Sequence, residues 1–220
     1  ILGGRCRYCK SQISFQYIAV EIFTGVLFVL SFIHAYLFYP AYFAIWDFVS
    51  LAGTSSALII IFVHDLRHKI IPDGATLIVG IMALSRIFAL YVWGIGNENL
   101  LLELSAGPLA ALPFFLLWLL SRGKWMGFGD VKLMLPLGWL VGWQLFLPAT
   151  IFAFWIGAIF VIVVKIYQKI FAGIFPSFVK KLPNLHLKSE VPFAPFLIIS
   201  ALVSLFFSSV VTSVVTVFLR

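Results

Sequence analysis

Runs of about twenty apolar residues recur along the chain, separated by short segments that hold most of its polar residues. A helix of that length crosses the hydrocarbon core of a bilayer, so each run predicts a membrane-spanning helix. The fifth and sixth spans are the hardest to delimit, because Pro136 and Pro148 interrupt their boundaries. The predicted spans are 17–38, 43–63, 74–94, 100–120, 131–147, 149–170 and 193–218.

The composition agrees with this pattern. Of the 220 residues, 63% are hydrophobic and 10% are charged, and the mean hydropathy is +1.12. Soluble domains are nearer half apolar and a quarter charged, so the composition excludes a soluble fold. Alternating strands of the kind that build a membrane β-barrel are also absent. We therefore predict an all-α, polytopic helical membrane protein with about seven transmembrane helices in this chain, embedded in a lipid bilayer.

The basic residues fall in alternate loops between the predicted spans, and the loops "YPAY" and "GIGNENL" hold none. Cytoplasmic loops carry an excess of Lys and Arg, so we predict that the N-terminus faces the cytoplasm. The net charge of +7 then reflects topology. Because it is divided among short loops, no nucleic acid partner is expected. The residues of the basic loops are Arg5, Arg7, Lys10, Arg67, Lys69, Arg122, Lys124, Lys132, Lys165, Lys169, Lys180, Lys181 and Lys188.

Three acids, Asp65, Asp73 and Asp130, lie at the predicted cytoplasmic face close to the ends of spans. Ionisable groups near membrane depth are costly and mark functional sites by default. Arg86, inside the third span, is expected to face the helix bundle or to snorkel toward the interface. The acids expected to be solvated or interfacial are Asp47, Glu98 and Glu103, and two more lie near cytoplasmic span boundaries, Glu21 and Glu190.

Asp65 lies where the second span ends and Asp130 lies where the fifth begins. Two carboxylates at the same depth can share one proton, so that one holds the proton while the other activates water. The helix dipole favours an anion at a helix start and a protonated acid at a helix end. Helix position therefore suggests Asp130 as the base and Asp65 as the acid, although His64 and Arg67 can reverse that order.

Simpler structural roles compete with this hypothesis. An isolated Asp at a span end is usually a solvated interfacial residue. Asp73 follows Pro72 and precedes an apolar run, which is typical of a helix N-cap. Gly127 and Gly129 can serve tight helix packing, or they can leave room for an extended peptide.

Four motifs in order resemble one family, the prepilin peptidases, also called type IV leader peptidases, of the GxGD membrane aspartyl proteases. The G-x-G-D motif alone is a weak signal, but the order and spacing of all four agree from Cys6 to the C-terminus. The motifs are "CRYCKSQISFQYIAVEIFTG" at 6–25, "DLRHKIIPD" at 65–73, "GKWMGFGDVKL" at 123–133 and "SEVPFAPFL" at 189–197.

The resemblance implies a multi-pass endopeptidase of the bacterial inner membrane. Such an enzyme cuts the leader from type IV prepilins and pseudopilins on the cytoplasmic side, in type IV pilus, type II secretion or competence systems. Asp65 and Asp130 match the two catalytic aspartates, and this proteolysis needs no metal or other cofactor. The motif residues expected to support them are Gly127, Gly129, Lys132, Pro72 and Asp73.

The N-terminal segment departs from the family pattern. Members of the family begin with a further helix and carry two C-x-x-C pairs, where four thiolates can close a zinc site. Here only Cys6 and Cys9 are present, so they are either half of such a site or a reduced pair. We expect residues 1–16 to be a remnant of the cytoplasmic cysteine-bearing segment and 17–220 to be the transmembrane protease domain.

Many members of the family also methylate the new N-terminus with S-adenosylmethionine, and Glu21 matches an acid of the methylating members. For this chain we leave that activity open. Two alternatives to a prepilin peptidase also stay open. One is another GxGD intramembrane protease, although the cysteine pair and "PFAPF" argue against it. The other is a non-enzymatic membrane assembly or transport protein.

Overall fold

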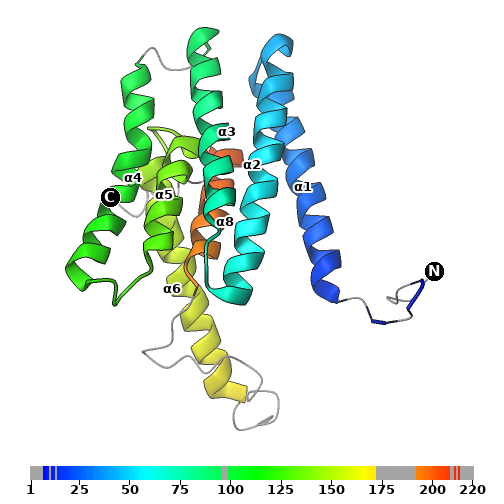
Figure 1. The fold of residues 1–220 in the computed structure, drawn as a ribbon, viewed down its shortest axis with the longest axis vertical. Helices are drawn as coiled ribbons and strands as arrows, with labels where there is room; N and C mark the ends of the chain where they lie inside the picture. Colours follow the sequence, from blue (N-terminus) through cyan, green and yellow to red (C-terminus); the bar gives the residue numbers. More distant parts are fainter. Residues whose placement is uncertain are drawn as a thin grey trace.

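The structure is a computed structural model that describes residues 7–9, 11–12, 14–95, 99–171, 192–208, 211 and 213. Within these residues the chain forms a bundle of α-helices (Figure 1). The helices are α1 (Phe15–Phe38), α2 (Ala41–His68), α3 (Asp73–Val92), α4 (Leu100–Ser121), α5 (Phe128–Val141), α6 (Phe146–Phe171) and α8 (Ala194–Phe206).

Five of these helices, α1, α2, α3, α4 and α6, are long and apolar enough to cross a membrane. This finding confirms the prediction of a polytopic helical membrane protein. α5 has 14 residues and α8 has 13 described residues. The second half of the predicted span 193–218 lies largely outside the described residues.

The bounds predicted around the fifth span were wrong. Its helix α5 begins at Phe128 and already ends at Val141, because Gly142 adopts φ = 79°, which suits glycine and ends the helix. Pro136 lies inside α5, and Pro148 lies in the first turn of α6 without preventing either helix. Proline is tolerated in a first helical turn because the backbone N–H it lacks there has no intrahelical partner.

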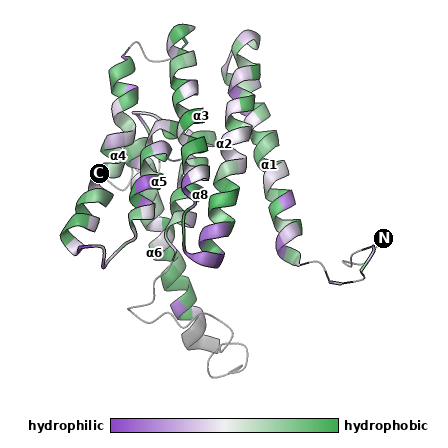
Figure 2. Cartoon of the chain, viewed as in Figure 1, coloured by the Kyte–Doolittle hydropathy of each residue, from purple (hydrophilic) through white to green (hydrophobic). Residues whose placement is uncertain are grey.

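The buried core of the bundle mixes alanines with larger side chains, whereas much of its outer surface carries large apolar side chains. Alanines such as Ala106, Ala110 and Ala153 are buried, whereas Phe23, Ile45 and other large side chains lie on the outer surface. Lipid tails are as apolar as these side chains, so helices in a bilayer associate through close packing of small residues. Figure 2 shows that the helices are largely hydrophobic along their length, and that hydrophilic residues lie at the lower end of α2 and in the α4–α5 loop.

The start of α1, the α2–α3 turn, the α4–α5 loop and the end of α6 lie at one end of the bundle (Figure 1). We call it the acidic-site end, because it holds Asp65 and Asp130, and we call the other the far end. The described residues of the predicted basic loops, among them Arg67 and Arg122, fall at the acidic-site end. Arg5, Lys10, Lys180, Lys181 and Lys188 lie outside the described residues.

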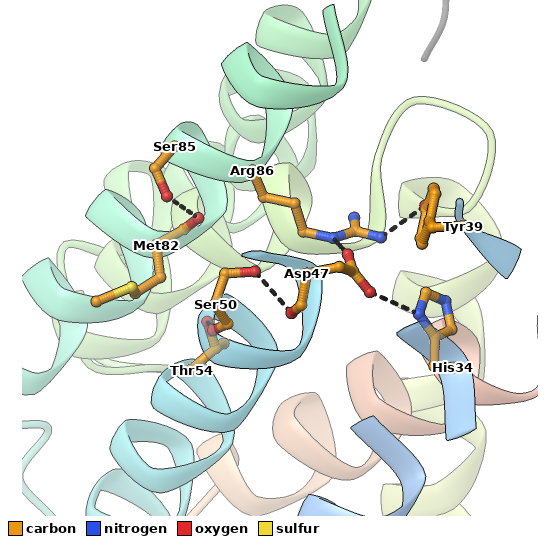
Figure 3. A network of polar contacts seen from close by, with 8 residues as sticks. All are labelled: His34, Tyr39, Asp47, Ser50, Thr54, Met82, Ser85 and Arg86. Atoms are coloured by element: carbon orange, nitrogen blue, oxygen red, sulfur yellow. Dashed lines mark hydrogen bonds and ion pairs between the residues drawn. The ribbon is translucent and has the colours of Figure 1, made fainter. Parts of the chain in front are cut away.

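The expectation that Asp47 is a solvated or interfacial group was wrong. Its side chain is fully buried near the far end, where it pairs with Arg86 and His34 (Figure 3). A buried carboxylate is tolerated there because it has an opposite charge and hydrogen-bond donors. Arg86 is buried in the bundle, the first of the two positions expected for it. Glu103 is half-buried and accepts a hydrogen bond from the backbone N–H of Trp143, whereas Glu98 and Glu190 lie outside the described residues.

Candidate active site

Asp65 lies in the last turn of α2, with only 5% of its surface exposed. The helix ends just beyond it because Lys69 adopts the left-handed conformation, φ = 53°, and donates its backbone N–H to the Asp65 carbonyl at 2.8 Å. The carboxylate oxygen Oδ2 is buried and has no hydrogen-bond partner among the described residues. No described protein group therefore engages this oxygen, and Asp65 also lines a cavity.

Asp130 lies in the first turn of α5, and Gly127 is the N-cap of that helix. The Asp130 backbone N–H donates to the Gly127 carbonyl at 3.3 Å. The Asp130 side chain is half-buried. The chain thus brings a carboxylate from the end of one helix and a carboxylate from the start of another to the same end of the bundle.

Both acids line one cavity of about 740 Å³. Its polar walls come from the two aspartate motifs. Its apolar wall contains Phe114 of α4, Phe154 of α6 and Phe193 before α8, with ring centroids of neighbouring pairs 5.3–6.2 Å apart. The cavity therefore offers two carboxylates beside an aromatic surface, which suits a substrate with polar and apolar parts.

Burial and the nearby Asp65 carboxylate raise the pKa of Asp130 to about 7. Burial contributes first, because it disfavours the charged form, and the like charge of Asp65 adds to it. A proton is therefore held on Asp130 at pH values where a solvated carboxylate is ionised. Helix position suggested the opposite order, with Asp130 as the ionised base.

The two glycines of the G-x-G-D motif have different surroundings. A Cβ built on Gly129 would lie 3.2 Å from Ile71 Cδ1, so Gly129 lets α5 pack against the loop that follows Asp65. Beside Gly127, a Cβ would meet only one atom within 4 Å, the Gly129 backbone nitrogen at 3.9 Å. The packing role suits Gly129, whereas Gly127 lines the cavity with open space next to it.

The assignment of Asp73 as an N-cap was wrong. Pro72 is the N-cap of α3 and Asp73 is the first helical residue, without a capping hydrogen bond. Its carboxylate instead pairs with Lys132 Nζ of α5 at 3.0 Å, and both side chains are largely in the open. Asp73 still gains from the positive end of the helix dipole, and with Lys132 it joins the two aspartate motifs across the cavity.

We expect Asp73→Asn to keep most of the activity of the wild-type protein. The pair with Lys132 is exposed, and exposed ion pairs contribute about 1 kcal/mol or less. The measurement is the initial rate of peptide cleavage together with the melting temperature in detergent. A folded variant that had lost cleavage would show that Asp73 takes part in the chemistry.

Sequence reasoning missed several residues that line the cavity. Lys69 belongs to the motif at 65–73 and Phe193 to the motif at 189–197. Membership of these motifs could have indicated that both residues lie near the acids. Phe114 and Phe154 gave no signal, because phenylalanine is ordinary inside apolar spans and only the packing of α4 against α6 reveals their common wall.

The proposed half of a zinc site stays a prediction. Cys6 lies outside the described residues, and Cys9 is exposed with Sγ 3.0 Å from Ser11 Oγ. Among the described residues, no three His, Cys, Asp or Glu side chains cluster as metal ligands. Two cysteines alone do not complete the four-ligand zinc site expected from the family pattern.

Two family models match the chain. The model described as "Type IV leader peptidase family" matches residues 52–162, and the model described as "Bacterial Peptidase A24 N-terminal domain" matches residues 1–35. The first match contains both acids, the α2–α3 loop and the G-x-G-D motif. No solved structure was found to match the chain.

Curated relatives match over most of the chain. A prepilin leader peptidase/N-methyltransferase of Stutzerimonas stutzeri is 28% identical over 214 residues, which are 96% of this chain and 65% of the relative. A protein of the same name from Klebsiella pneumoniae is 33% identical over 151 residues, which are 68% of this chain and 62% of the relative. Another from Legionella pneumophila is 29% identical over 219 residues, which cover 94% of this chain and 64% of the relative.

The chain thus spans slightly less than two thirds of the length of these relatives. The leader peptidase model nevertheless covers half of the chain, including the helices that carry both acids. On this evidence the chain belongs to the type IV leader peptidase family.

Proposed function

We propose that this chain carries the proteolytic centre of a membrane endopeptidase that cleaves the leader from type IV prepilins and pseudopilins. The observation that carries the proposal is that Asp65 and Asp130, from different helices, line one cavity beside the G-x-G-D glycines. The names of the relatives, prepilin leader peptidase/N-methyltransferase, support the substrate class.

The proposed chemistry needs one proton shared by the two acids. The ionised carboxylate takes a proton from water as the water oxygen attacks the scissile carbonyl, and the protonated carboxyl donates its proton to the carbonyl oxygen. A proton then passes to the leaving nitrogen as the C–N bond breaks. The raised pKa of Asp130 supports Asp130 as the acid and Asp65 as the base, although the two titrate as a pair.

We expect cleavage to fall as the pH rises through about 7. Asp130, whose pKa is about 7, holds its proton below that pH and loses it above, which leaves two carboxylates and no acid. The measurement is the initial cleavage rate across pH, with Asp73→Asn as a control that should keep the same profile. A rate that continued to rise beyond about pH 8 would contradict this assignment of the proton.

The site is proposed to face the cytoplasm from the bacterial inner membrane, on the basis of the positive-inside rule. The aromatic wall from α4, α6 and the start of α8 lies beside the acids. A pilin helix that stays in the bilayer would approach this wall from the lipid, while its polar leader meets the acids from the aqueous side. This arrangement would place the scissile bond at the edge of the membrane.

Methylation of the new N-terminus is a second candidate activity, because the relatives are named prepilin leader peptidase/N-methyltransferase. S-adenosylmethionine would be the methyl donor. The segment with Cys6 and Cys9 falls in the match to the N-terminal domain, so we propose that any zinc is held there and not at the acids. Glu21, exposed on α1, is the candidate acid of that segment.

The decisive experiment incubates the purified protein in detergent or nanodiscs with a model prepilin, beside Asp130→Asn prepared in the same way. The expected result is a shortened pilin with the wild-type protein alone. If the folded wild-type protein left the prepilin intact while a curated relative cut it, the proposal would be wrong.

A further inference from the structure

A buried polar network joins three helices near the far end of the bundle (Figure 3). Asp47 of α2 accepts a hydrogen bond through Oδ1 from Nε of Arg86 on α3, at 2.6 Å. Its other oxygen, Oδ2, lies 3.1 Å from Nδ1 of His34 on α1. Arg86 Nη2 donates to the Tyr39 hydroxyl in the α1–α2 turn at 2.9 Å. Each oxygen of the Asp47 carboxylate thus has its own partner, on a different helix.

The network lies far from the acids, yet it shares a helix face with one of them. Asp47 and Asp65 are 18 residues apart on α2, which is five turns of 3.6 residues and about 27 Å along the axis. Both therefore point in the same direction from α2. The buried stripe between them includes Leu51, Leu58 and Ile61. A shift or rotation of α2 at Asp47 would accordingly be passed to Asp65.

The remaining contacts between α2 and α3 have little directionality. Ser50 and Thr54 donate to carbonyls of α2 itself, and Ser85 donates to a carbonyl of α3. Gly53 faces the flexible side chain of Met82 at about 3.8 Å. Among the described residues, the Asp47–Arg86 pair is the side-chain hydrogen bond that joins these two helices.

α3 also packs against α5, the helix that holds Asp130, so the position of α3 affects the position of α5. Gly80 of α3 lies against Pro136 of α5, with 3.7 Å between the ideal Gly80 Cβ and Pro136 Cβ, and Asp73 pairs with Lys132. A continuous path therefore runs from Asp65 along α2 to Asp47, across to Arg86, and along α3 to α5.

We propose that Asp47 and Arg86 are positioning residues, which set the axial register of α2 against α3 and so hold Asp65 opposite Asp130 across the cavity. Buried ion pairs between helices can specify register at the cost of some stability. The inference rests on the proposed function only in its effect on cleavage, because the register itself is measurable without a substrate.

The test removes the pair without leaving a buried charge. In Asp47→Leu/Arg86→Met, apolar groups of similar size replace both partners, a change that is often neutral or stabilising. Arg86→Lys is a second variant, which keeps the charge but lacks the guanidinium fork that bonds Asp47 and Tyr39 together. The matched control is Leu51→Ala, which weakens the same buried stripe but leaves the pair intact.

Two readouts are taken. Spin labels at Leu66 of α2 and Phe128 of α5, both exposed, report the distance between the two helix ends in a background with Cys6 and Cys9 replaced by Ser. The unlabelled proteins give kcat and KM for a model prepilin. We expect the double variant to melt near the wild-type temperature, yet to broaden the label distribution or shift it by about 1.5 Å or more, the rise of one residue.

We also expect its kcat to fall at least about tenfold with little change in KM, because misplacing a reacting group slows the chemical step. Leu51→Ala should melt earlier but keep the label distance and kcat. An unchanged label distribution in both the double variant and Arg86→Lys would overturn the inference. If the wild-type protein cut no prepilin, the proposed function would fail, and the label distances would still decide the register.

Discussion

Asp130→Asn is expected to reduce cleavage of a model prepilin by about 10⁴-fold or more, without loss of folded, membrane-inserted protein. Asn has nearly the same shape as Asp but cannot hold or exchange the proton that the paired mechanism requires. General acid–base groups contribute up to about 10⁴-fold, and a dyad that acts as one unit loses most of its effect when either member is lost. Asp65→Asn should be equally inactive, and substitution of either acid by Ala should abolish cleavage.

The measurement is single-turnover cleavage under excess enzyme, followed by gel shift of the pilin, with thermal unfolding in parallel. Asp73→Asn is the matched control, because it makes the same substitution in a third acid that lines the same cavity. A dead Asp73→Asn beside a normally active Asp65→Asn would mean that the first catalytic acid had been assigned to the wrong position. Full activity in Asp130→Asn would exclude the two-aspartate mechanism.

The placement of both acids at one end of the bundle was predictable from the sequence. Asp65 ends a long apolar run and Asp130 begins one, so alternating spans bring them to the same side. The basic loops support the same topology through Arg67 and Arg122. These features depend on periodicity and charge along the chain, which a single sequence displays directly.

The surroundings of individual polar residues were less predictable. Asp47 stands near the start of an apolar run, which is also where a solvated acid would stand. Its burial depends on Arg86 and His34, which lie 39 and 13 residues away along the chain. The sequence likewise placed Asp73 next to a helix start, but only the fold brings Lys132 within 3.0 Å of it. Partners distant in sequence decide such cases, and spacing does not reveal them.

The length of α5 shows a similar limit. Its apolar run continues past Val141, so hydropathy predicted a longer span, yet Gly142 with its positive φ ends the helix there. α5 packs deep in the bundle against α4, with Trp139 Nε1 of α5 donating to the Leu104 carbonyl of α4 at 2.8 Å. A helix enclosed by neighbours need not span the bilayer alone, because the surrounding helices separate it from lipid.

This α4–α5 contact is the basis of the second large expected effect, a loss of stability in Gly138→Ala. An ideal Cβ on Gly138 would lie 2.7 Å from the Ala106 carbonyl oxygen, 2.7 Å from Ala110 Cβ and 2.8 Å from Gly107 Cα. Two of these three atoms belong to the backbone of α4, which cannot rotate away as a flexible side chain can. The two helices would have to move apart, and every close contact between them would weaken.

We expect Gly138→Ala to lower the free energy of unfolding by about 3 kcal/mol or more, at or above the upper end of the usual cost of overpacking. Gly25→Ala is the control, because Gly25 lies inside α1 and a Cβ there meets no atom within 4 Å. That substitution should be neutral or stabilising by up to about 1 kcal/mol, since Ala favours the helix.

The measurement is thermal or denaturant unfolding in detergent with both variants side by side. Because α5 carries Asp130 in its first turn, any Gly138→Ala protein that remains folded should also cleave more slowly. Equal stability of the two variants would show that α4 and α5 do not pack as closely as the structure has them.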